Sequence, residues 1–221
     1  MFFKNLRMDI DAAKRNDPAA RNKFEIWLTY SGVKALSYHR AARFFYRAHM
    51  KLLARMISQL AKRRTGIEIH PAANIAGGVF IDHGSGVVIG ETAEVETDVV
   101  IYQCVTLGGS GKETGKRHPT IKRGTVIGAG AKILGGFTVG EYSKIGAGAV
   151  VLKEVPPHST VVGVPGKVVR VANEKLPCDL KQDQCDPITE ELCRLRDRVH
   201  RLEEELNRIQ AKTKKDHHEN L

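Results

Sequence analysis

Two histidines that each stand beside a charged residue are the first candidates for chemistry in this 221-residue chain. His83 follows Asp82, and His118 follows Arg117. A neutral imidazole with a pKa of about 6.5 can take a proton from a hydroxyl at neutral pH. Glu68 lies fifteen residues before His83 and is a candidate acceptor for the other nitrogen of that base. These residues predict general-base chemistry at His83.

The Arg117-His118 pair indicates a site for an anion. A guanidinium group binds a carboxylate through two hydrogen bonds, and an imidazole can add a third. The alternative is a solvated basic loop that includes Lys112, Lys116 and Lys122. A structural role is likewise the commoner one for a histidine in general. The places of both histidines in the repeat described below favour function.

Other motifs point less clearly to chemistry. The glycine-rich stretch 107–111 lacks the Lys-Ser/Thr ending of a phosphate-binding loop, but it would let a thin ligand lie against the chain. Cys178, Cys185 and Cys193 are separated by six and seven residues, unlike the short pairs of a zinc site, and His217-His218 lies near the end. We therefore expect no metal.

A six-residue repeat dominates the middle of the chain and must position these groups. An aliphatic residue returns every sixth position in three runs, and the fifth position of each hexad is mostly small. The aliphatic positions are Ile69, Ile75, Ile81, Ile89, Val95, Ile101, Leu107, Ile121, Ile127, Ile133, Val139, Ile145 and Val151. Period six fits a chain that turns a corner every six residues, with three sides to each coil, and such coils bury a core only by stacking. The repeat predicts about five coils of a hexapeptide β-helix.

The repeat is interrupted twice, and each interruption carries one of the two histidines. Residues 82–86 hold His83, and residues 108–120 hold Arg117 and His118. Loops that leave a rigid scaffold are common places for binding and catalysis. The interruptions therefore favour a functional role for both groups.

Segments of different character flank the repeat. Residues 1–65 have apolar positions near a period of 3.6, which predicts helices, with Asp17 as an N-cap, Pro18 at the first helical position and Gly32 between two helices. Residues 66–170 form the repeat, and residues 171–221 form a tail. In the tail a heptad pattern over 187–210 predicts a short coiled coil, with a helix packed on its own domain as the alternative.

Composition excludes several classes of protein. The sequence has no apolar run long enough for a membrane span or a secretory signal. Its four cysteines are too few for a disulfide framework, so we expect a cytoplasmic protein. The net charge of +10 is concentrated in residues 1–66, which hold 15 Lys and Arg against 4 Asp and Glu. These charges follow helical spacing without a nucleic-acid motif, which favours a solvated or substrate-steering face over nucleic acid.

Several strings together resemble the serine O-acetyltransferase family, over roughly residues 5–170. The strings are GIEIHPAANI, FIDHGSGVVIGET, VTLGGSGKETGKRHPTI, VIGAGAKILG and SKIGAGAVVLKEVPPHSTVVGVPGKVV. The resemblance implies an α + β protein, in which a helical N-terminal domain precedes a left-handed parallel β-helix. It also implies transfer of acetyl from acetyl-CoA to the hydroxyl of L-serine, which gives O-acetyl-L-serine for cysteine biosynthesis.

The resemblance assigns roles to individual residues. His83 would be the general base on the serine hydroxyl, in a ternary complex without an acetyl-enzyme. Its partner would be Glu68, where many members have Asp. The serine ammonium group would bind Asp17 and Asp82, and the carboxylate would bind Arg117, with His118 lining the site.

Acetyl-CoA would lie along the coils between two subunits. Its binding residues would be Gly109, Ala129, Lys144, Ala147 and Lys167. Cys104 matches no nucleophile of the family, and we expect it to face packing.

Assembly follows the same resemblance. We expect a homotrimer, with a hexamer built as a dimer of trimers as the alternative, and three parallel tails could form the coiled coil. Longer members of the family end on Ile and insert into O-acetylserine sulfhydrylase; this chain ends on Leu221, which leaves that partner open.

Other functions remain open on the sequence alone. Homoserine or a sugar could be the acceptor on the same scaffold, although Arg117 and two acids favour an amino acid. A scaffold protein without catalytic activity is an alternative of another class. Cysteine feedback and the roles of Cys178, Cys185 and Cys193 are also undecided.

Overall fold

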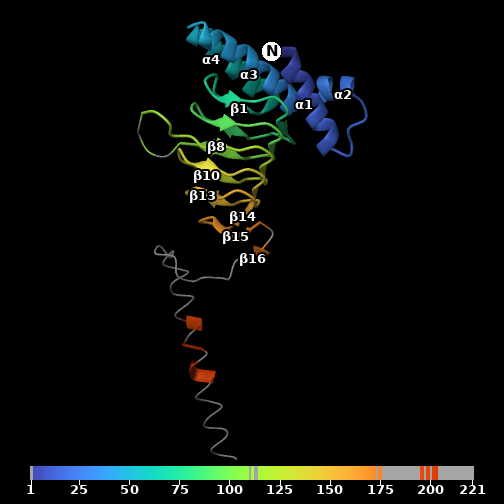
Figure 1. Ribbon diagram of the computed structural model, residues 1–221. Helices are drawn as coiled ribbons and strands as arrows, with labels where there is room; N and C mark the ends of the chain where they lie inside the picture. Colours follow the sequence, from blue (N-terminus) through green and yellow to red (C-terminus); the bar gives the residue numbers. More distant parts are fainter. Residues whose placement is uncertain are drawn as a thin grey trace, which may run out of the picture. The chain divides into compact units, whose positions relative to one another are not determined.

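The computed structural model describes residues 2–109, 111, 114–172, 174–175, 195–196, 198–199 and 201–203. The chain divides into two compact units, Met1–Pro177 and Cys178–Leu221. In the first unit, four helices cover the β1 end of a stack of short strands (Figure 1). None of the helices in the described part of the chain has the length and apolarity needed to cross a bilayer.

The helical layer consists of α1 (Phe2–Asn16), α2 (Lys23–Thr29), α3 (Ser31–Arg47) and α4 (Lys51–Thr65). Helices in residues 1–65 are thus confirmed, but part of their apolar series faces outward. Leu36 is buried in the core of the strands, whereas Trp27, Leu52 and Met56 are exposed. The apolar period therefore places the helices but does not say which side is covered.

The predicted start of a helix at Asp17-Pro18 is wrong. Both residues lie in the connection between α1 and α2, where the Asp17 carbonyl accepts from the Ala20 N–H and closes a turn. The N-cap of α2 is Asn22, whose side chain accepts from the Glu25 N–H. Asp17 therefore does not begin a helix, and its N–H donates instead to the Ala13 carbonyl at the end of α1.

The predicted helix break at Gly32 is also displaced. The break falls at Tyr30, which has an extended backbone, and Gly32 lies in the first turn of α3. A Cβ at Gly32 would stand 2.2 Å from the carbonyl oxygen of Ile81. Gly32 therefore serves the close approach of α3 to the strand that leads into Asp82 and His83.

The described residues contain sixteen short strands, and the first thirteen rotate through three sheets in turn. They are β1 (Glu68–Ile69), β2 (Asn74–Ile75), β3 (Phe80–Ile81), β4 (Val88–Ile89), β5 (Glu94–Val95), β6 (Val100–Ile101), β7 (Thr106–Gly108), β8 (Thr120–Ile121), β9 (Val126–Ile127), β10 (Lys132–Leu134), β11 (Thr138–Val139), β12 (Lys144–Ile145), β13 (Val150–Val151), β14 (Ser159–Val162), β15 (Lys167–Val171) and β16 (Glu174–Lys175). Sheet A has the order β1-β4-β7-β10-β13, sheet B β11-β8-β5-β2, and sheet C β16-β15-β14-β12-β9-β6-β3. From β1 to β14 all pairings are parallel, while β14–β15 and β15–β16 are antiparallel.

The core confirms the predicted repeat. All thirteen aliphatic positions of the six-residue period are buried, and they form one cluster. They pair in register from coil to coil, as Ile69 does with Ile89 and Ile89 with Leu107. The period of six therefore records one inward side chain per strand.

Each coil has three corners, which we name by the sheets that they join. The C–A corner leads from sheet C to sheet A and contains residues 82–87, 102–105, 128–131 and 146–149. The A–B corner contains residues 70–73, 90–93, 109–119 and 135–137, and the B–C corner contains residues 76–79, 96–99, 122–125 and 140–143. The first interruption of the repeat thus widens a C–A corner, and the second widens an A–B corner.

Two sequence-based expectations concern residues away from these interruptions. Cys104 was expected in packing, but it is exposed at the C–A corner with a positive φ of 59°. The predicted coiled coil 187–210 lies largely outside the described residues; those described at 195–196, 198–199 and 201–203 are helical, and Leu195, Val199 and Leu202 are exposed. Cys178, Cys185, Cys193 and Leu221 lie outside the described residues.

Candidate active site

The predicted site residues gather in two groups at two different corners of the stack. His83 and Asp82 lie at the C–A corner, between β3 and β4. Arg117 and His118 lie at the A–B corner, between β7 and β8. Each group includes further polar residues. We call His83, Asp82, Asp17 and Tyr30 the base group, after the expected role of His83. We call Arg117, His118, Glu91 and Thr92 the carboxylate group, because Arg117 is expected to bind a carboxylate.

The base group joins the helical layer to the first interruption of the repeat. The hydroxyl of Tyr30 donates to Asp17 Oδ2 at 2.5 Å, and the Ala19 N–H donates to Asp17 Oδ1 at 2.7 Å. His83 Nε2 lies 3.9 Å from Asp82 Oδ1, and its side chain is 79% exposed. The base group therefore presents two carboxylates and an imidazole to the surface.

Electrostatics link the members of the base group. The Tyr30 hydroxyl, the Ala19 N–H and the charge of His83 lower the pKa of Asp17, with the Tyr30 hydrogen bond as the largest cause. The same bond, with burial and the charges of Asp17 and Asp82, raises the pKa of Tyr30 to about 12. Asp17 is therefore an anion and Tyr30 a donor at neutral pH.

Glu68, the expected partner of His83, makes a different contact. It opens β1, and its Oε2 lies 2.6 Å from Lys62 Nζ at the end of α4. The carboxylate that lies beside His83 is that of Asp82. The pairing of Glu68 with His83 stays a prediction.

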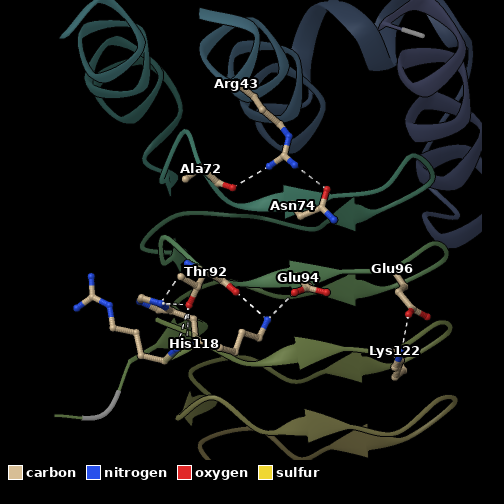
Figure 2. Close-up of polar contacts among 10 residues, drawn as sticks. Arg43, Ala72, Asn74, Thr92, Glu94, Glu96, His118 and Lys122 are labelled. Carbon is tan, nitrogen blue, oxygen red and sulfur yellow. Dashed lines mark hydrogen bonds and ion pairs between the residues drawn. The ribbon is translucent and has the colours of Figure 1, made fainter. Parts of the chain in front are cut away.

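The carboxylate group is tightly bonded. Arg117 Nη2 lies 2.9 Å from Glu91 Oε2, and the two side chains are similarly half-exposed. Thr92 bonds to His118 through both its backbone and its hydroxyl (Figure 2). Glu91 and Thr92 belong to the coil that precedes the second interruption. Arg117 and His118 therefore bond to that preceding coil.

The shape of the carboxylate group depends on Gly90. A Cβ at that position would stand 2.0 Å from both Cδ2 and Nε2 of His118. The imidazole therefore lies against the backbone of Gly90, and its side chain is almost wholly buried. Burial, as the largest cause, and the charge of Arg117 lower the pKa of His118, so the ring is neutral at neutral pH.

The expected acetyl-CoA residues follow the same two corners. Ala129 and Ala147 lie one above the other at the C–A corner, where the Gly148 N–H donates to the Ala129 carbonyl at 2.8 Å. A Cβ at Gly128 would stand 2.6 Å from the backbone nitrogen of Ala147, so backbone approaches backbone there. Gly109 lies instead beside Arg117 at the A–B corner.

The two lysines expected at the phosphates lie on sheet C. Lys144 opens β12 and Lys167 opens β15, and both are exposed. Binding of acetyl-CoA by these small residues and lysines stays a prediction.

Sequence reasoning missed Tyr30, Glu91, Thr92 and Gly90. They come from other elements than the residues they contact, so no local spacing indicates them. For Glu91 and Thr92 the repeat did contain a signal. They lie shortly after Ile89, at the same corner of a coil as Arg117 and His118, which lie shortly before Ile121. Among the described residues, no group of three or more His, Cys, Asp and Glu side chains could hold a metal ion.

The chain is similar to known transferases. The family model "Bacterial transferase hexapeptide (six repeats)" matches residues 118–153. A serine acetyltransferase of Bacillus pumilus (strain SAFR-032) is 53% identical over 213 residues, which are 96% of this chain and 98% of that protein.

Solved structures of relatives include bound molecules. A Neisseria gonorrhoeae serine acetyltransferase in complex with serine superimposes with a TM-score of 0.73 at 42% identity, over 75% of this chain and 68% of that one. A serine acetyltransferase in complex with CoA gives a TM-score of 0.73 at 41% identity, over 76% and 70% of the two chains.

Proposed function

The chain belongs to the serine acetyltransferase family, and from this premise we propose that it transfers acetyl from acetyl-CoA to the hydroxyl of L-serine. The observation that carries the proposal is the pair of groups at the two corners. One offers carboxylates and an imidazole, and the other offers a guanidinium and a neutral imidazole. A zwitterion with a hydroxyl matches this complement of charges.

Each part of the amino acid has a suitable receptor. The ammonium group would bind Asp17 and Asp82, of which Asp17 is held by two hydrogen bonds. The carboxylate would bind Arg117, with His118 beside it. The hydroxyl would then lie near His83, where positioning converts binding into reactivity.

The reaction needs one base. His83 takes the proton of the serine hydroxyl while the oxygen attacks the thioester carbonyl carbon of acetyl-CoA. The carbon–sulfur bond then breaks, and His83 returns the proton to the leaving thiolate of CoA. Glu68 would orient the ring of His83 once the Glu68 carboxylate has left its ion pair with Lys62.

Acetyl-CoA is the second substrate of the reaction. Gly109, Ala129 and Ala147 would let it approach the backbone, and Lys144 and Lys167 would meet its phosphates. The stacking of Ala129 and Ala147 at the C–A corner supports this path.

The separation of the two groups supports a homotrimer. Within one chain the base group lies where the strands of sheet A begin, and the carboxylate group lies where they end. If sheet A faces a threefold axis, the C–A corner of one chain meets the A–B corner of the next, and three complete sites result. A hexamer would add pairing of the helical layers.

The finer description of the fold is part of the proposal. We infer that the stack is a left-handed parallel β-helix over residues 66–170, after a helical domain of residues 1–65. The tail of residues 171–221 would contribute a coiled coil at 187–210. The six-residue period and the rotation of strands through three sheets support this division.

Two further expectations remain predictions. A cytoplasmic location suits the use of acetyl-CoA and serine. Binding of O-acetylserine sulfhydrylase through Leu221 would need an apolar pocket that accepts Leu.

The proposed function is tested by thiol release from acetyl-CoA with L-serine, with L-homoserine and without acceptor. We expect release with serine, lost by about 10²–10⁴-fold in His83→Ala. Release with homoserine at an equal kcat/KM, or a fully active His83→Ala protein, would overturn the assignment of substrate or base.

A further inference from the structure

We propose that Thr92 is a positioning residue that fixes His118 as the neutral tautomer protonated at Nε2, so that His118 serves as a hydrogen-bond donor to the substrate carboxylate. The inference rests on the proposed function for the identity of the substrate. The tautomer itself does not depend on that function. Thr92 lies at the A–B corner one coil before the interruption that carries His118 (Figure 2).

The side chain of Thr92 satisfies its full hydrogen-bonding capacity within the carboxylate group. Its oxygen accepts from the backbone N–H groups of Arg117 and His118 at 3.1 and 3.0 Å. A hydroxyl has two acceptor positions and one donor. Since both acceptor positions are filled, the hydroxyl hydrogen remains for His118 Nδ1, which lies 2.9 Å away.

The backbone of Thr92 fixes the same tautomer. Its N–H also points to His118 Nδ1, at 3.2 Å, and a backbone N–H can only donate. Nδ1 thus receives two donors and carries no proton. In a neutral imidazole the proton must then be on Nε2.

The surroundings of Nε2 keep this donor available. Cβ atoms placed on Gly90 and Gly109 would stand 2.0 and 3.3 Å from Nε2, so glycine is present on both sides of it. The neighbouring charges are those of Arg117, Glu91 and Lys116. Arg117 pairs with Glu91, and Lys116 pairs with Glu94. A neutral N–H donor beside the guanidinium of Arg117 suits an incoming carboxylate.

His70 shows a similar arrangement two coils before His118. Its Nδ1 accepts from the Ala72 N–H at 3.1 Å, and burial, as the largest cause, lowers its pKa. His118 differs from His70 in the additional hydroxyl of Thr92. A backbone N–H at Nδ1 therefore recurs at this corner, and Thr92 reinforces it where the substrate would bind.

Nitrogen-15 NMR of the histidine ring nitrogens at neutral pH tests the tautomer, with His118→Asn to assign the signal. We expect an unprotonated Nδ1 and a protonated Nε2 in the wild-type protein. A protonated Nδ1 would overturn the proposal whether or not the protein acetylates serine. Conversely, a protein inactive toward serine that keeps the Nε2–H tautomer would contradict the proposed function alone.

Steady-state kinetics of Thr92→Val tests the role of the hydroxyl. Valine keeps the shape and the backbone donor but leaves the N–H groups of Arg117 and His118 without their acceptor. We expect the KM for serine to rise by about tenfold with a smaller change in kcat, and the Nδ1-protonated tautomer to gain a minor population, because one of the two donors to Nδ1 is lost and the backbone N–H remains. An unchanged tautomer and an unchanged KM would overturn the proposal.

Two further variants separate positioning from a loss of stability. Thr92→Ser retains the hydroxyl and should keep the wild-type tautomer, with the KM within about threefold of the wild-type value. Thr138→Val makes the same change on β11, outside the carboxylate group, and should alter neither. If Thr92→Ser behaves like Thr92→Val, the hydroxyl is not the cause and the proposal is wrong.

Discussion

Asp17 shows how a carboxylate in a loop is prepared for binding. One of its oxygens accepts from the Ala19 N–H and the other from the Tyr30 hydroxyl, so the group is held before any ligand arrives. A sequence can suggest an acid at such a position. The donor from Tyr30 depends on a tertiary contact across thirteen residues, and no local pattern predicts it.

Tyr30→Phe tests this support. The variant removes only the donor to Asp17, so we expect the KM for serine to rise by roughly tenfold while kcat changes little. Tyr142→Phe is the matched control, because Tyr142 stacks on His158 at the other end of sheet C. Equal KM values for wild type and Tyr30→Phe would show that Tyr30 does not prepare the ammonium site.

Gly90 sets the position of His118 through the absence of a side chain. Gly90→Ala places a Cβ where the imidazole lies, so the ring must leave its bonds with Thr92. We expect the KM for serine to rise by about tenfold or more.

The control for Gly90→Ala is the same change in a His118→Ala background. If Gly90 acts through His118, the double variant should show no further loss beyond His118→Ala. Additive losses in the double variant would contradict this mechanism and indicate a general effect on the coil.

At the scale of elements, the repeat was predictable and the helical layer only in part. Each strand of a coil has one inward aliphatic side chain. The position of Ile69 or Ile127 in the repeat is therefore enough to predict that it is buried. In the helices the same kind of residue is buried at Leu36 and exposed at Leu52. The helix breaks at Tyr30 and not at Gly32, because Gly32 is used for the close contact of α3 with β3. The sequence of the helix alone does not predict that contact.

Helix α3 also carries a buried histidine that makes stability depend on pH. His39 is 3% exposed, and burial as the largest cause, with the charges of Arg43 and Arg40, lowers its pKa to about 3. The unfolded chain binds a proton on His39 below its ordinary pKa of about 6.5, and the folded chain does not. Stability is therefore lost as pH falls from 6.5 toward 3.

Denaturation at pH 7.5 and 5.5 measures this effect, with His39→Gln as the comparison. We expect the wild-type free energy of unfolding to fall between these pH values by about 1 kcal/mol more than that of His39→Gln. The same pH dependence in both proteins would show that His39 titrates alike in the folded and unfolded chains.

At the scale of the whole molecule, the central claim is that two corners of the stack form one site only across chains. His83 with Asp82, and Arg117 with His118, were predictable from the sequence because they lie where the repeat is interrupted, whereas Tyr30, Glu91 and Thr92 were not. The separation of the two groups within a chain was not predictable, since it depends on which sheets the interruptions join. In the proposed trimer, this separation would make assembly part of catalysis.

The most direct measurement is activity after mixing two inactive proteins. His83→Ala lacks the base and Arg117→Ala lacks the carboxylate receptor, and each alone should be inactive. When the two are refolded together in equal amounts, three in four trimers are expected to be mixed, each with one intact site, so about one quarter of wild-type activity should return. No recovery of activity from mixed trimers would contradict a site shared between chains.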